Sequence, residues 1–204
     1  ATGLLLQPDG RSIATGYATP SGGNADFVLV RYFSSGTIDT SFNTSGLMIS
    51  DLFTGNDYAY GAFLQPDGRP VLVGSTVVGG KTVFAIARFE TSGILDTSFN
   101  TTGKLNTSLT SNTNVLYGVR VLSNSKILAG GTAQDATYEL AAVRLFTDGS
   151  LDTTFHTDGR VSLAVGTGTD YIYAVTILPD GRMLAGGKLI DGDHEAWVIT
   201  RYWP

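Results

Sequence analysis

Short apolar runs alternate with polar, glycine-rich turns along the whole chain. In one representative stretch the apolar runs cover residues 62–65, 70–75, 83–89 and 105–109. None of these runs has the 3.6-residue apolar period of an amphipathic helix, and the turns between them are rich in Gly, Pro, Asn and Asp. The pattern predicts an all-β chain of short antiparallel strands with almost no helix.

This pattern recurs four times at a nearly constant spacing. An Arg ends the third apolar run of every copy, and successive copies of this Arg are 57, 56 and 57 residues apart. Eight residues after it, the first three copies carry an Asp inside the segment Gly-x-Ile/Leu-Asp-Thr-Ser/Thr-Phe. The repeated positions are Arg31, Arg88, Arg144, Arg201, Asp39, Asp96 and Asp152. A period kept by several motifs indicates a repeat protein.

A Pro-Asp-Gly-Arg turn joins the first two strands of a copy, at residues 8–11, 66–69 and 179–182. In such a turn Pro presets φ, Asp hydrogen-bonds to the backbone and Gly accepts a positive φ. The third copy has Ser-Asn-Ser-Lys at residues 123–126, which we interpret as a degenerate turn of the same polarity.

Four antiparallel strands in each copy predict the blades of a β-propeller, because the second and third strands are apolar on both faces and each blade packs between two others. On one third strand Phe84 and Ile86 share a face, and Ala85 and Ala87 share the opposite face, which lets neighbouring blades interdigitate. A β-solenoid is the alternative, although its repeats are usually half this length or shorter. The prediction is one propeller domain or propeller fragment. Its blades are expected at residues 1–57, 58–114, 115–170 and 171–204, the last without its fourth strand.

The motifs Leu-Gln-Pro-Asp-Gly-Arg at 6–11 and 64–69 and Leu-Asp-Thr-Ser-Phe-Asn at 95–100 resemble the bacterial delta-sixty repeat family. This resemblance implies a β-propeller in a secreted or cell-surface protein, and it brings no catalytic residues with it. The opening of each copy is also similar to NHL-type blades, which implies that the first strand lines the central channel. The chain departs from the pattern in the third copy, which lacks Pro-Asp-Gly, and in the fourth, which stops after its third strand.

The repeated Arg and Asp residues are interpreted as structural anchors of the repeat. Arg88 lies on the same strand face as Phe84 and Ile86, and a charge so far inside needs a partner. We therefore expect Arg31, Arg88 and Arg144 each to pair with a repeated Asp, within the blade or across to the next.

Composition excludes several classes of function. The net charge is −5, with 13 basic and 18 acidic residues and no basic cluster, which argues against nucleic acid and anionic membranes as partners. No apolar run is long enough for a membrane-spanning helix, so no membrane insertion is expected. The absence of Cys excludes disulfides and thiolate sites.

No motif of a known catalytic site is present, so the chain is not expected to be an enzyme and no cofactor is expected. A glycoside-active enzyme is the less favoured alternative, because its two carboxylates leave no local signature. The acidic stretch at 190–195 could bind a hard cation but lacks the spacing of an EF-hand, and we interpret it as a solvated loop, with no metal. His156 occupies the place of Asn43 and Asn100 and is expected to be a turn residue.

The loops joining second to third strands and the segments entering each first strand differ in every copy, while the other turns are nearly constant. Antiparallel strands place the two kinds of connection at opposite ends of the blades, and the varied end suits recognition. Tyr58 and Tyr171, each beside an Asp, suggest an aromatic and carboxylate surface for sugars. The ligand-binding residues predicted there are Asn56, Asp57, Tyr58, Asn114, Asp170, Tyr171, Asp191, Asp193 and His194.

The hypothesis from the sequence is a non-catalytic extracellular module that binds a glycan or protein, or acts as a scaffold. A structural subunit or spacer of a cell-surface assembly is the alternative. The apolar edge strand from Ala196 to Trp203 is expected to be covered by a partner chain or by self-association, because unpaired edges are templates for pairing.

Overall fold

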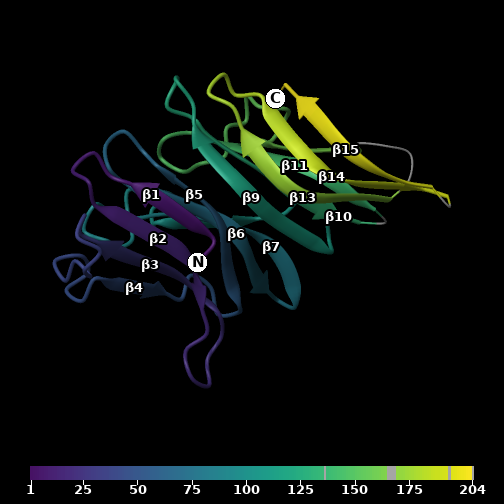
Figure 1. Ribbon diagram of the computed structural model, residues 1–204. Coiled ribbons are helices and arrows are strands. Elements are labelled where there is room, and N and C mark those ends of the chain that lie inside the picture. The colour runs from purple at the N-terminus through teal and green to yellow at the C-terminus, as the bar shows by residue number, and fades with distance from the viewer. Residues whose placement is uncertain (136, 165–168, 193, 204) are drawn as a thin grey trace.

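The chain forms fifteen strands in the computed structural model (Figure 1), which describes residues 1–135, 137–164, 169–192 and 194–203, with residues 169, 170 and 191 described by backbone only. The described residues contain no helix, and so none that could cross a membrane. The strands form sheets of four, eight and three strands. The eight-stranded sheet consists of two antiparallel groups joined by one parallel pairing, Thr82 with Thr113, and the resulting four antiparallel groups are here called blades 1 to 4 in chain order.

The bounds of the strands are as follows. Blade 1 contains β1 (Gly3–Leu6), β2 (Ser12–Ala18), β3 (Asp26–Tyr32) and β4 (Leu47–Ser50). Blade 2 contains β5 (Asp57–Leu64), β6 (Pro70–Val78), β7 (Lys81–Arg88) and β8 (Lys104–Thr107). Blade 3 contains β9 (Thr113–Val121), β10 (Ile127–Gln134), β11 (Tyr138–Leu145) and β12 (Arg160–Leu163). Blade 4 contains β13 (Thr169–Ile177), β14 (Met183–Asp191) and β15 (His194–Tyr202).

Burial on both faces of a blade holds neighbouring blades together. On β7, Phe84 and Ile86 are fully buried in the core between blades 2 and 3, whereas Ala85 and Ala87 lie in the core between blades 1 and 2. A third core, which includes Met183, lies between blades 3 and 4. The alternation of large and small residues predicted for this strand is confirmed, and it lets the blades interdigitate.

The first strand of each blade lies beside the first strand of the next, so that β1, β5, β9 and β13 form a row (Figure 1) and line a hollow of about 390 Å³. These strands approach closely at glycines. A Cβ atom on Gly61 would lie 2.5 Å from the carbonyl oxygen of Tyr117, and one on Gly118 would lie 2.5 Å from that of Val175. No larger residue fits at these two places without movement of the backbone.

The first strands are longer than the sequence pattern predicts. In blade 2 the strand begins at Asp57 and not at residue 62, and the segments 57–58, 113–115 and 169–171 are the beginnings of strands instead of loops. A β-bulge explains the error, because the register of β5 shifts between Ala59 and Gly61 and that of β13 between Ile172 and Ala174. The extra residue interrupts the alternation by which a strand is recognised.

The end of the blades that carries the Pro-Asp-Gly turns is here called the constant end, and in blades 1 to 3 it contains a buried charged cluster. In blade 2, Arg88 Nε donates to Asp96 Oδ2 at 2.6 Å, and Ser98 Oγ donates to Asp96 Oδ1 at 2.6 Å. Burial alone would raise the pKa of the Asp96 carboxyl, but the hydrogen bonds from Ser98 and Arg88 outweigh it and hold this pKa below its usual value.

The same pair closes blades 1 and 3, where Arg31 Nε and Arg144 Nε donate to Asp39 and Asp152 at 2.8 and 2.6 Å. The pairing expected from the eight-residue spacing is therefore present in each of the first three blades. A second base joins each Asp, at 3.1, 2.7 and 2.8 Å for Arg11, Arg69 and Lys126. Arg201 is exposed on β15, and no Asp follows it in the sequence.

The cluster also fastens blade 1 to blade 2 and blade 2 to blade 3. Arg31 donates to the carbonyl oxygen of Thr91 in blade 2 at 3.0 Å, and Arg88 donates to that of Thr147 in blade 3. The guanidinium of Arg31 lies 4.7 Å from the centre of the Phe42 ring. This ring covers Gly93 of blade 2, where a Cβ atom would lie 2.6 Å from it.

The degenerate turn of the third copy has the same conformation as the Pro-Asp-Gly turns. Gly10 has a φ of 84° and donates its N–H to the Gln7 carbonyl at 3.0 Å. Ser125 stands at the corresponding place with a φ of 65° and donates to the Leu122 carbonyl at 2.9 Å. A serine with a positive φ is strained, because its Cβ atom approaches the backbone too closely.

Replacing this serine with glycine is expected to stabilise the chain. Ser125→Gly removes a left-handed strain of about 1–2 kcal/mol, part of which is offset by the greater freedom of glycine in the unfolded chain, so a gain of roughly 0.5–1 kcal/mol is expected. The midpoint of urea unfolding measures this gain. Ser123→Gly in the same turn is the control, because Ser123 has no positive φ and should gain nothing. Equal or lower stability of Ser125→Gly would contradict the prediction.

Removing the guanidinium of blade 2 is expected to destabilise the chain strongly. Arg88→Ala leaves Asp96, which is 1% exposed, with Arg69 as its remaining base, so a loss of about 3 kcal/mol is expected. This corresponds to a fall in Tm of roughly 6–12 °C for a chain of this size. Arg182→Ala is the control and should change little, because the Arg182–Asp180 pair is open to solvent. A Tm within 2 °C of wild type for Arg88→Ala would show that the ion pair does not fasten the blades.

Candidate functional site

The end of the blades opposite the constant end is here called the varied end. It carries the connections from each second to third strand and from each blade to the next. The loop of blade 1 covers residues 19–25, whereas the corresponding loop of blade 2 is residues 79–80 alone. Side chains at this end therefore differ from blade to blade while the strands below them stay constant.

A row of tyrosines runs from the varied end into the hollow between the first strands. The ring of Tyr58 lies 4.9 Å from that of Tyr17 and 6.2 Å from that of Tyr60. The ring of Tyr60 in turn lies 5.8 Å from that of Tyr117. Tyr60 and Tyr117 line the hollow of about 390 Å³ together with Arg120. Such rings offer flat apolar surface with a hydrogen-bonding hydroxyl at one edge.

Burial raises the pKa of Tyr60, and the neighbouring tyrosines Tyr17, Tyr117 and Tyr58 add to this effect. Its hydroxyl therefore stays protonated well above neutral pH and can donate a hydrogen bond. A second aromatic group joins blades 3 and 4. Its ring centres are 5.4, 6.5 and 6.2 Å apart along the series Tyr138, Tyr171, Tyr173 and Trp197.

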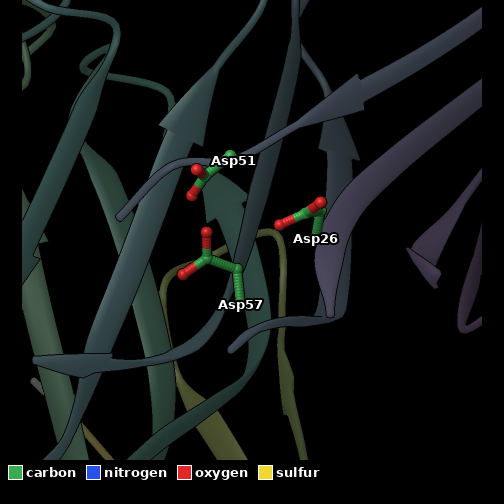
Figure 2. A group of neighbouring side chains, drawn as sticks. All are labelled: Asp26, Asp51 and Asp57. Carbon is green, nitrogen blue, oxygen red and sulfur yellow. The ribbon is translucent and has the colours of Figure 1, made fainter. Parts of the chain in front are cut away.

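Three aspartates meet at the varied end between blades 1 and 2 (Figure 2). Asp26 begins β3, Asp51 follows β4 and Asp57 begins β5, and one carboxylate oxygen from each lies within 4.8 Å of the others. Asp57 is fully buried, Asp26 is half-buried and Asp51 is exposed. Figure 2 shows the three side chains turned toward a common space. This group is here called the aspartate cluster.

The charge of the aspartate cluster is not balanced by the residues around it. In the part of the chain that the structure describes, no Lys or Arg forms an ion pair with any of its members, in contrast to the doubly paired Asp96. Burial raises the pKa of Asp57 and of Asp26, and in both cases the charge of Asp51 raises it further. Backbone N–H groups of Leu52 and Phe53 oppose this rise at Asp57.

The other predicted residues have separate places. Asn56 accepts a hydrogen bond from the backbone of Ala25 at 2.8 Å, so its side chain holds two loops together. Asn114 is fully buried and bonds to the backbone as well. His194 is exposed at the start of β15, opposite Asp191, because a turn at Gly192 makes the loop shorter than expected.

Of the remaining predicted residues, Asp193 lies outside the described residues, and Asp170 and Asp191 are placed by their backbone in β13 and β14. Although they are neighbours in the sequence, Asp57 belongs to the aspartate cluster and Tyr58 belongs to the tyrosine row. The structure places Tyr171 in the second aromatic group.

A larger hollow lies at the constant end, away from these groups. It has a volume of about 880 Å³ between blades 2 and 3, and Arg69, Arg88 and Asp148 contribute to its wall. Arg120 and Phe63 line both this hollow and the smaller one between the first strands. Its charged groups include those that fasten the blades, so size alone does not make it the better candidate site.

Sequence reasoning missed several members of the aromatic groups and two members of the aspartate cluster. Tyr60, Tyr117 and Tyr173 occupy one position of the repeat, and an alignment of the copies would have revealed them. Asp26 and Asp51 carry no such signal, because they join Asp57 only through the fold.

Comparison with known proteins identifies the repeat. A family described as a domain of unknown function (DUF5122) with a beta-propeller fold matches residues 7–42, 65–99 and 122–155, which together are just over half of the chain. A comparison with curated proteins gives no match.

Among solved structures, an endo-arabinase from Bacteroides thetaiotaomicron is similar with a TM-score of 0.47 and 11% sequence identity, over 97% of this chain and 73% of that chain. At this identity the likeness concerns the arrangement of strands and gives no information on activity. The all-β propeller class predicted from the repeat is confirmed, whereas the delta-sixty assignment stays a prediction. The chain belongs to the DUF5122 beta-propeller family.

Proposed function

We propose that this chain is a non-catalytic binding module of a secreted or cell-surface protein and that it binds a glycan along the tyrosine row. The observation that carries the proposal is the continuous set of rings from Tyr17 and Tyr58 at the varied end to Tyr60 and Tyr117 in the hollow. A concave surface with aromatic walls and a few polar groups is the usual form of a small-ligand site.

The polar groups of the row suit a hydroxyl-rich ligand. The protonated hydroxyl of Tyr60 can donate to a sugar oxygen, and Arg120, which lines the same hollow, adds a fixed set of donors. The rings of Tyr58 and Tyr60 lie nearly parallel, with an interplanar angle of 17°, and present faces on which a sugar ring can stack.

A glycoside-active enzyme is less well supported. Such enzymes place two carboxyl groups on either side of the bond that is cleaved, roughly 5–10 Å apart. The carboxylates of the aspartate cluster do not fit this arrangement well, because Asp57 is fully buried and cannot lie beside a bond of a bound sugar.

A glycan array followed by titration calorimetry tests the binding proposal. Tyr60→Ala combined with Tyr117→Ala is expected to weaken glycan binding roughly tenfold or more, because each aromatic contact contributes about 0.5–1.5 kcal/mol. Tyr117→Phe keeps the ring and should retain most of the affinity. Tyr32→Ala is the control, since Tyr32 lies on β3, two strands outward from the hollow. No glycan binding by the wild type, or unchanged binding by the double variant, would contradict the proposal.

A second function, self-assembly, is supported by the outward faces of blades 1 and 4, which are half-buried at Val28 and Val30 and exposed at Trp197 and Ile199. Trp197 and Ile199 on β15 occupy the repeat positions of Phe84 and Ile86, which are fully buried, yet both are 83% exposed. On blade 1, Val28 and Val30 take the positions of Ala85 and Ala87, which pack against the preceding blade. The two outer faces thus repeat the two halves of an internal blade interface, and we propose that a second copy of the chain packs head to tail on them.

Light scattering at micromolar concentration tests self-assembly. The wild-type chain is expected to form dimers or larger species, and Trp197→Lys combined with Ile199→Lys is expected to shift it to a 21.5 kDa monomer with the same circular dichroism. Lys81→Glu changes an exposed charge at the start of β7 and should leave the association unchanged. A wild-type monomer at all concentrations would contradict the proposal.

A further inference from the structure

The aspartate cluster contains one buried oxygen atom without a hydrogen bond of normal geometry. Asp57 is 0% exposed, and its Oδ2 atom accepts hydrogen bonds from the backbone N–H groups of Leu52 and Phe53 at 2.7 and 3.0 Å. Its Oδ1 atom has no hydrogen-bond partner. A buried polar atom without a partner costs about 1–3 kcal/mol, so its presence calls for a water molecule or an ion.

The hydroxyl oxygen of Thr76 lies opposite the same carboxylate. Thr76 is 0% exposed, lies directly across the strand pair from Asp57, and its hydroxyl has no hydrogen bond of normal geometry. The hydroxyl is nevertheless close enough to lower the pKa of the Asp57 carboxyl, so it faces that group. A neutral oxygen therefore lies beside the carboxylate of Asp57.

The contact between blades 2 and 3, here called the second junction, has neutral residues at the positions that the three aspartates occupy between blades 1 and 2. Between blades 2 and 3 the positions of Asp26, Asp51 and Asp57 are occupied by Val83, Ser108 and Asn114. Asn114 Oδ1 accepts from the backbone of Leu109 and Thr110, as Asp57 Oδ2 does from Leu52 and Phe53.

The other terminal atom marks the difference between the two junctions. Asn114 Nδ2 donates to the carbonyl oxygens of Thr82 and Thr110 at 3.1 and 3.2 Å. The corresponding atom of Asp57 is the oxygen Oδ1, which cannot donate a hydrogen bond. Where Asn114 has an N–H group between blades 2 and 3, Asp57 therefore has a second acceptor between blades 1 and 2. A cation at this place would restore the balance.

We propose that Asp26, Asp51 and Asp57 bind one calcium ion at the varied end of the junction between blades 1 and 2. The donors are carboxylate oxygens with a hydroxyl beside them, and hard cations prefer such ligands over the softer metals that His and Cys select. Two oxygens on opposite sides of a calcium ion are about 4.6–5.2 Å apart, and around magnesium about 4.0–4.2 Å. The three oxygens of the cluster lie within 4.8 Å of one another, which is inside the span that calcium ligands can cover.

The site has a route to solvent and a rigid frame. Asp51 is exposed and borders a hollow of about 380 Å³, which can admit the ion and the water ligands that calcium retains. Lys104 borders the same hollow but donates its ammonium group to the Leu52 carbonyl. Asn24 and Asn56 tie the loop of blade 1 to the segment that carries Asp51, through contacts of 3.0 Å to Thr54 and 2.8 Å to Ala25.

Thermal unfolding of the EGTA-treated chain during titration with calcium chloride tests the proposal. A saturable rise in Tm is expected, roughly 5–10 °C at a free calcium concentration one hundred times Kd. Asp57→Asn introduces the chemistry of Asn114, and its Tm is expected to be independent of calcium and no lower than that of the calcium-free wild type. Asp51→Asn changes an exposed residue, should fold normally, and should weaken calcium binding about tenfold or more in calorimetry.

Asp135→Asn is the matched control, because Asp135 lies in the varied loop of blade 3, and it should respond to calcium like the wild type. Four outcomes would overturn the proposal: no response of the folded wild type, an equal response to magnesium, a full response that persists in Asp57→Asn, or the same affinity in Asp51→Asn.

Discussion

A buried guanidinium on the third strand is the interaction on which the rest of this fold depends. Arg88 enters an interior where an unpaired charge would be prohibitive, so Asp96 and Ser98 must turn back to meet it, and that requirement shapes the connection between the third and fourth strands. The same group reaches Thr147 in the following blade. One side chain thus fixes a turn, neutralises a carboxylate and sets the position of a neighbour.

Because the contacts at the constant end hold the blades together, the residues of the varied end can differ from blade to blade. Because the blades are fixed by Arg–Asp pairs and by close contacts of glycines in the first strands, the connections at the varied end do not have to hold the fold together. Two junctions of one chain can then place Asp57 and Asn114 at the same position with different chemistry. The contacts that stabilise the fold and the sites proposed for binding therefore lie at opposite ends of the blades.

The repeat made most of the fold predictable, because the same pattern of strands, turns and Arg–Asp positions occurs in the sequence of several copies. The Arg88–Asp96 pair followed from spacing and burial, and the two-sided packing of β7 followed from its alternation of large and small residues. The beginning of β5 could not be predicted from the sequence, because a β-bulge at Tyr60 interrupts the alternation of side chains between the two faces of the strand. Asp26, Asp51 and Asp57 could not be grouped in advance, because only the packing of blade 1 on blade 2 brings them together.

The acceptors of the inter-blade contacts have a consequence for how such chains can change in length. Arg31 and Arg88 bind carbonyl oxygens of the main chain, at Thr91 and Thr147, and every residue type carries that group. A duplicated or exchanged copy therefore offers the carbonyl oxygen that the Arg of the preceding copy binds, and the preceding copy needs no matching substitution. Genes for such proteins can gain or lose whole repeats in single recombination events while each surviving copy continues to diverge at its free end.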